Sequence, residues 1–179
     1  MEHQNRGAMI QECKDHQGGI LLELAYEFGA ILARCCELTQ AAADIMQDGN
    51  GNDLYEQMST TEDDAWMLHQ YVDAAWQEVV ELCRAYVHCL PTPVRGDEVT
   101  PEYSLALQLP QHWDSIGAVT IDGSIEDLLI SSATQEWWIK RGNADLANVE
   151  AIRIASCRSK IKYSLNSRRG YKGRPTSYF

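Results

Sequence analysis

The chain lacks an apolar stretch long enough to cross a bilayer. Its longest mostly apolar run, Gly18 to Ala33, is interrupted by Glu23 and Glu27, whereas a membrane-spanning helix needs about 20 predominantly apolar residues. The N-terminal residues also lack the apolar segment that follows the charges of a secretory signal peptide. We therefore expect a soluble protein that is made in a reducing compartment and whose six cysteines are free thiols.

Motifs for metal and phosphate sites are missing as well. The nearest approximation to a zinc site, Cys83 with His88 and Cys89, has the wrong spacing for a helical ligand pair. Gly117 and Gly123 lack the lysine and the spacing of a phosphate-binding loop. Buried or surface residues without a ligand explain all of these positions, so we expect no metal and no cofactor.

No catalytic constellation is visible either. A hydrolase that uses His69 or His112 with nearby carboxylates has no motif in its favour. The acids from Glu62 to Asp64 suit a divalent cation in principle, but the start of a helix explains all three at once. We therefore expect a protein that is not an enzyme.

Acidic residues are absent from the last 27 residues, Arg153 to Phe179, which hold eight of the 15 Lys and Arg residues. Residues 1–152 contain all 26 acidic residues and the other seven basic ones, so their formal charge is 7 − 26 = −19, against +8 for the C-terminal part. Such a chain has one surface that repels polyanions and one segment that attracts them, or attracts an acidic neighbour.

The length of 179 residues fits one domain, which at this size buries roughly 70% of its unfolded surface. Apolar residues recur at spacings of three and four along four segments, and this period predicts helices. The predicted helices cover about 19–46, 59–87, 124–140 and 144–165. Ser59 and Glu62 stand at the spacing of a capping box for the second helix.

Two adjacent residues separate the last two predicted helices. Gly142 is expected to end one of them in a left-handed conformation, and Asn143 is expected to cap the next. The inward row of the last helix is predicted to consist of Leu146, Val149, Ile152 or Arg153, Ser156 or Cys157, and Ile161.

Tyr103 to Leu109 alternates between apolar and polar residues, which predicts a short strand with one buried face. Its partner is either the poorly patterned segment from Val94 to Thr100 or a strand of another chain. The segment from Ile116 to Ile121 is ambiguous between helix and strand, because Asp122 and Gly123 resemble a turn.

The expected fold class is mainly α: an antiparallel bundle of about four long helices, with one short strand or hairpin and an extended basic C-terminal arm. Residues 1–166 form an acidic helical domain in this prediction, whose first helix (about 19–46) lies at its periphery. Residues 167–179 form the C-terminal arm, which has two glycines, a proline and no periodicity.

Basic and aromatic residues alternate in the C-terminal arm. They suit contact with phosphates and bases, docking on an acidic partner protein, or a solvated tail. Trp137 and Trp138 face about 100° apart on a helix, so one indole is expected in the core and one at the rim, either in an interface or as a lid on the core. The predicted partner-binding residues are Arg168, Arg169, Tyr171, Lys172, Arg174, Tyr178, Phe179 and Trp138.

Four sequence segments carry a resemblance to a known family. They are TTEDDAWMLHQYVDAAWQEVVELCRAY, SLALQLPQHWD, SIEDLLISSATQEWW and a helix that ends in KYSLNSRRG. Their succession over about Ser59 to Arg169 resembles the head–tail connector (adaptor or head-completion) proteins of tailed bacteriophages. In that family an acid-rich cap starts a long helix, a short strand ends in a proline, and a tryptophan-bearing helix leads to a last helix and a basic arm.

The resemblance implies a non-enzymatic virion subunit in the head–tail neck, synthesised in the host cytoplasm. Such a subunit forms a ring, typically of twelve copies, below the portal protein. It also contacts tail or other neck proteins, while DNA passes through the channel without sequence-specific contact and no membrane takes part. The alternative is a small helical nucleic-acid-binding phage protein, a packaging subunit or regulator, that uses the basic stretch from Arg158 to Arg174.

Overall fold

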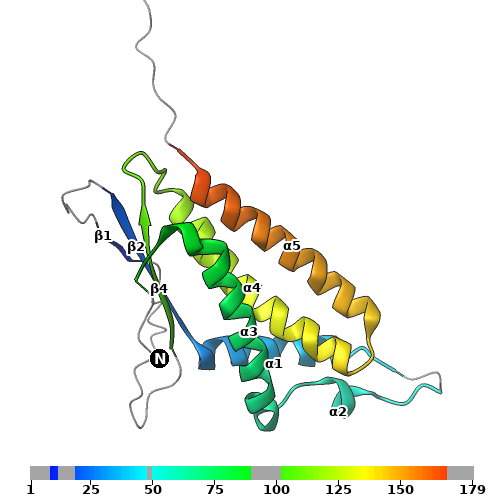
Figure 1. The fold of residues 1–179 in the computed structure, drawn as a ribbon. Helices are drawn as coiled ribbons and strands as arrows, with labels where there is room; N and C mark the ends of the chain where they lie inside the picture. Colours follow the sequence, from blue (N-terminus) through cyan, green and yellow to red (C-terminus); the bar gives the residue numbers. More distant parts are fainter. Residues whose placement is uncertain (1–8, 12–18, 48–49, 90–101, 169–179) are drawn as a thin grey trace, which may run out of the picture.

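The computed structural model describes residues 9–11, 19–47, 50–89 and 102–168. Four longer helices pack beside an antiparallel sheet that lies at one end of the molecule (Figure 1). The elements in chain order are β1 (Met9–Gln11), β2 (Ile20–Glu27), α1 (Phe28–Ala43), α2 (Tyr55–Met58), α3 (Ala65–Cys83), β3 (Val87–Cys89), β4 (Glu102–Leu109), α4 (Gly117–Lys140) and α5 (Ala144–Asn166).

The sheet has four strands in the order β1-β2-β4-β3, and all neighbouring strands are antiparallel. β4 is the strand that the alternation over Tyr103 to Leu109 predicts, and this prediction is confirmed. Because β2 and β3 of the same chain flank β4, the expectation that another chain completes its pairing is wrong. The second proposed partner, Val94 to Thr100, lies outside the described residues.

The predicted fold class is wrong in its first segment. Residues 20–27 form β2, which pairs with β4 along its whole length, from Ile20 opposite Leu109 to Glu27 opposite Glu102. Leu22, Leu24 and Tyr26 point into the core while Glu23 and Glu27 are exposed, so the segment fits a period of two as well as a helical period. The fold is therefore a mainly helical protein with a four-stranded sheet, and its first segment is central rather than peripheral.

The second predicted helix is shorter than expected at both ends. A 3-10 turn precedes α3. In this turn the Asp64 carboxylate accepts hydrogen bonds from the backbone N–H and the hydroxyl of Thr61, both at 3.0 Å. The side chain of Glu62, the second member of the predicted capping box, lies outside the described side chains. α3 ends at Cys83, and after a second 3-10 turn the chain enters β3.

The ambiguous segment from Ile116 to Ile121 belongs to α4, which runs without a break through Asp122 and Gly123. The signals at the end of α4 are confirmed: Gly142 has a φ of 74°, and the side chain of Asn143 accepts a hydrogen bond from the N–H of Leu146. α4 and α5 are therefore an antiparallel pair joined by a tight connection (Figure 1).

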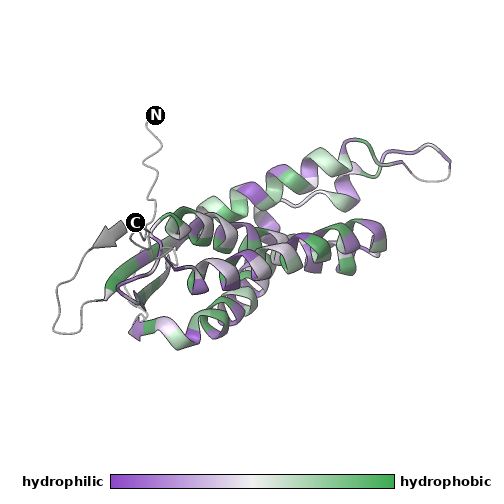
Figure 2. Ribbon diagram, turned by 90° about the horizontal axis from the view of Figure 1, so that it is seen from above, coloured by the Kyte–Doolittle hydropathy of each residue, from purple (hydrophilic) through white to green (hydrophobic). Residues whose placement is uncertain are grey.

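α4 is the central helix of the fold. It packs against α5, α3, α1 and β2, whereas α5 packs mainly on α4 and to a smaller extent on α3. Each helix carries both hydrophobic and hydrophilic residues, interspersed along its length (Figure 2). None of the helices in the described part of the chain has the length and apolar character needed to cross a membrane.

Candidate interaction surface

The C-terminal arm begins beside the start of α4. Trp113 is fully buried there, and its indole N–H donates to the carbonyl of Ser164 at 2.7 Å. Arg168 forms an antiparallel bridge with Trp113, and its guanidinium donates to the carbonyls of Leu165 (3.2 Å) and Ser167 (3.0 Å). The base of the arm is therefore held against the body of the protein.

Most of the predicted partner-binding residues lie beyond this point. The structure describes Arg168, whereas the other six members of the arm lie outside the described residues: Arg169, Tyr171, Lys172, Arg174, Tyr178 and Phe179.

Trp138 is not at a rim. Trp137 and Trp138 are 0% and 2% exposed, so the expectation that one of them reaches the surface is wrong. The Trp137 indole donates to the carbonyl of Met58 at 2.7 Å, and Trp138 packs in a small cluster with Met67 and Ala147. Both indoles belong to this cluster, so residues from α2, α3 and α5 together bury two adjacent side chains at the end of α4.

α5 carries an exposed row on the side away from α4. Val149, Ile152 and Tyr163 are 44%, 72% and 79% exposed, and the exposed Ser156 and Ser159 continue the row between them. The predicted inward positions at Val149 and at Ile152 or Arg153 are therefore wrong, whereas those at Cys157 and Ile161 are confirmed. The buried row consists of Ala147, Glu150, Ile154, Cys157, Ile161, Ser164 and Leu165.

Two of the basic residues on α5 are paired with carboxylates. Arg153 donates to the buried Glu150 at 2.9 Å, and Arg158 donates to Glu78 of α3 at 2.7 Å. The other two, Lys160 and Lys162, are exposed. Positive charge on α5 is thus partly neutralised by the protein itself.

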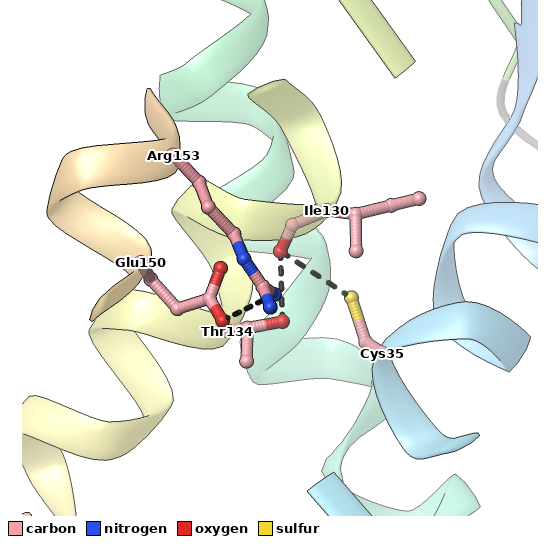
Figure 3. Close-up of polar contacts among 5 residues, drawn as sticks. All are labelled: Cys35, Ile130, Thr134, Glu150 and Arg153. Atoms are coloured by element: carbon pink, nitrogen blue, oxygen red, sulfur yellow. Dashed lines mark hydrogen bonds and ion pairs between the residues drawn. The ribbon is translucent and has the colours of Figure 1, made fainter. Parts of the chain in front are cut away.

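Figure 3 shows the buried polar cluster where α1, α4 and α5 meet. Thr134 donates to the carbonyl of Ile130 at 2.8 Å, and the Cys35 thiol contacts the same oxygen at 3.8 Å. Burial raises the pKa of Cys35 to about 12, so this thiol stays protonated and is a poor nucleophile at neutral pH. In the described part of the chain, the Oε2 atom of Glu150 has no hydrogen-bond partner.

His69 belongs to a second polar group, which joins α3 to the sheet. Its Nδ1 lies 3.4 Å from Asp73, whose other carboxylate oxygen accepts the hydroxyl of Tyr103 at 2.7 Å. Burial, with the hydrogen bond to Asp73, raises the pKa of the Tyr103 phenol, so the Tyr103 hydroxyl stays protonated at neutral pH. Within the described ranges, no group of three or more His, Cys, Asp or Glu side chains is placed to hold a metal ion.

A groove of about 520 Å³ lies between α1, α4 and α5. Arg34, Arg153 and Lys160 line it together with the acids Glu126 and Asp127, over a floor that includes Leu38 and Ile130. Desolvation, followed by the nearby charges of Asp122 and Asp127, raises the pKa of Glu126. Both signs of charge around a partly apolar floor suit contact with a protein surface better than contact with a polyanion.

No protein-family model, curated protein or solved structure shows a significant match to this chain.

Proposed function

We propose that the chain is a non-enzymatic structural subunit of a tailed-bacteriophage virion. In this proposal it is a head–tail connector that oligomerises into a ring below the portal protein, docks through its C-terminal arm and forms part of the DNA channel. The resemblance of the segments between Ser59 and Arg169 to connector proteins is the origin of the proposal.

The separation of charge carries the argument. All 26 acidic residues precede Arg153, and the eleven residues after Arg168 contain three basic and three aromatic residues and no acid. The body thus repels DNA, which suits a channel that DNA slides through. The arm, whose base is held at Trp113, combines the positive charge and aromatic rings that anchor protein contacts.

The described surface supports an assembly role more than a catalytic one. The Cys35 thiol and the Tyr103 phenol both have raised pKa values, so neither of them is an activated nucleophile at neutral pH. The largest exposed apolar side chains include members of the outer row of α5, which lead toward the C-terminal arm.

A nucleic-acid-binding phage protein is the second candidate, and the exposed Lys160 and Lys162 on α5 favour it. The two arginines nearest to them on α5 weaken it, because Arg153 and Arg158 are already paired with Glu150 and Glu78. These carboxylates would also repel phosphates that approach the helix.

A truncation tests the connector proposal. The chain that ends at Arg168 keeps the contact with Trp113 and loses only residues 169–179, so it is expected to stay folded and helical. Electron microscopy of the full chain mixed with candidate portal proteins should show rings on the portal, and the truncated chain should show none. Portal-bound rings of the truncated chain would contradict a docking role for the arm.

A salt titration separates the two candidates. A protein that grips DNA through the arm loses affinity steeply with salt, with a log–log slope near −0.9 for each phosphate neutralised. We expect no duplex shift by the full chain at physiological salt. A monomer that ignores portal proteins and shifts DNA with such a slope would replace the connector proposal with the nucleic-acid one.

A further inference from the structure

The first turns of α4 carry a second exposed row. Ile116 and Val119 are 78% and 80% exposed, although both are large apolar side chains. Gly123 and Glu126 continue the row at spacings of four and three. A methyl group added at Gly123 would contact nothing within 4 Å, so the middle of this row is open.

The charges beside this row are negative. Asp122 and Asp127 flank it, and their repulsion of Glu126 adds to the desolvation that raises the pKa of that carboxyl. The α4 row therefore combines exposed apolar side chains at its start with three acids toward its end, where Arg34 of α1 acts against the rise in the pKa of Glu126.

The C-terminal half of the outer row of α5 has the opposite charge. Lys160 and Lys162 lie beside Ser159 and Tyr163, which continue the row from Ile152 and Ser156. Both rows repeat at three and four residues, which is the spacing that packs one helix along another. Large apolar side chains that stay exposed in such a row mark a surface that a partner covers.

We propose that the outer row of α5 in one copy of this chain packs against the α4 row of a second copy. The inference deepens the proposed function and rests on it for the ring, because it names the two surfaces through which neighbouring subunits meet. The occupant of each row is a second copy because the chain itself offers an apolar-basic row and an apolar-acidic row that complement each other.

An antiparallel arrangement of α5 from one copy and α4 from the other matches both the side-chain sizes and the charges of the two rows. With Tyr163 over Val119 of the second copy, Ser159 falls on Gly123, so two small residues meet where the helices come closest. The same register places Lys160 and Lys162 within about two residues of Asp122 along the helix axis. Ile152 then lies over the groove whose floor includes Leu38 and Ile130.

The contact is heterologous, because each copy uses one row for one neighbour and the other row for the next. Such contacts close into rings or continue as open chains, whereas a contact between two identical rows would stop at a dimer.

Two substitutions at exposed positions test the contact. Ile152→Glu changes only the α5 row and Val119→Glu changes only the α4 row. Each should raise the dissociation constant of self-association by about 30-fold or more, as expected when a central apolar contact is replaced by a charge. Sedimentation velocity over a concentration series measures this, and circular dichroism with unfolding midpoints checks that both variants fold like the wild type.

Mixing the two variants is the decisive measurement. The Ile152→Glu copy keeps an intact α4 row and the Val119→Glu copy keeps an intact α5 row, so one contact forms between them and no more. Each variant alone should be monomeric, and an equimolar mixture should give 1:1 heterodimers. Ile45→Glu is the matched control, since Ile45 is 85% exposed and lies outside both rows, and it should assemble like the wild type.

Several results would overturn the inference: a wild-type chain that stays monomeric at high micromolar concentration, either row variant assembling normally, or a mixture that remains monomeric. The proposed function fails separately. Assembly that depends on both rows, by a chain that ignores portal proteins, would leave the contact standing and remove the phage-neck role. If rings still form on a portal protein when both substitutions are present, the phage-neck role would stand and the proposed contact between the rows would be wrong.

Discussion

The inner and outer rows of α5 have the same spacing and opposite environments. Ile154 and Ile161 of the inner row are 3% and 0% exposed, whereas Ile152 and Tyr163 of the outer row are 72% and 79% exposed. The inner row includes the carboxylate of Glu150, and the outer row includes an isoleucine, so hydrophobicity alone does not separate them. A helix can carry two regular rows, and its neighbours decide which one is covered.

The largest difference in the free energy of unfolding is expected between two matched isoleucine truncations on this helix. Ile154→Ala should lower the free energy of unfolding by about 2–5 kcal/mol, because it truncates a buried side chain that lies between α3 and α4. Ile152→Ala, measured below the concentration of self-association, should change it by less than about 0.5 kcal/mol. Urea denaturation followed by circular dichroism measures both. Equal losses for the two variants would mean that the assignment of inner and outer rows is wrong.

The charged member of the inner row gives a smaller effect. Arg153→Met removes the guanidinium from Glu150, whose side chain is 7% exposed, while the arginine side chain is 54% exposed. We expect a loss of about 1–3 kcal/mol, below the range for a fully buried pair because water reaches the arginine.

The Glu150→Gln background is the control for this effect. In this background, Arg153→Met should lower the free energy of unfolding by less than about 1 kcal/mol, because no buried charge is left unpaired. A double-mutant cycle measures the coupling. A cost that is the same in both backgrounds would show that Arg153 acts through packing of its carbon chain and not through its charge.

The smallest effect concerns the flank between the two rows. Arg158 bonds to Glu78 across α3 and α5, and the two side chains are 45% and 32% exposed. Arg158→Ala should cost less than about 1 kcal/mol, and this cost should shrink in 1 M NaCl because salt screens exposed charges. A decrease in the free energy of unfolding above about 2 kcal/mol that does not depend on salt would contradict this, because it would show that the pair stabilises the fold as much as the buried residues of the inner row do.

Local signals predicted much of the helical hairpin. Gly142 and Asn143 mark the end of α4 and the start of α5 because a left-handed glycine and an asparagine cap act within a few residues of chain. The alternation over Tyr103 to Leu109 identified β4 for the same reason. The two exposed rows were within reach of the sequence too, since their spacing is regular, but spacing alone assigned Val149 and either Ile152 or Arg153 to the core.

Other features depend on contacts between distant residues. β2 fits both a helical and an extended period, and its pairing with β4 over a separation of about eighty residues selects the strand. Trp138 is buried because Met67 and Ala147 come from α3 and α5 to cover it. No pattern around Trp138 contains that information.

The sequence by itself determined the charge separation, most of the helical residues after residue 27 and the strand β4, because composition and short-range periodicity are properties of neighbouring residues. Only the tertiary structure decided that residues 20–27 join the sheet, that Arg168 is held beside Trp113 and that the inner row of α5 is the one with Glu150. Those choices depend on which surfaces meet, and a helix with two regular rows exposes whichever row its own chain does not cover.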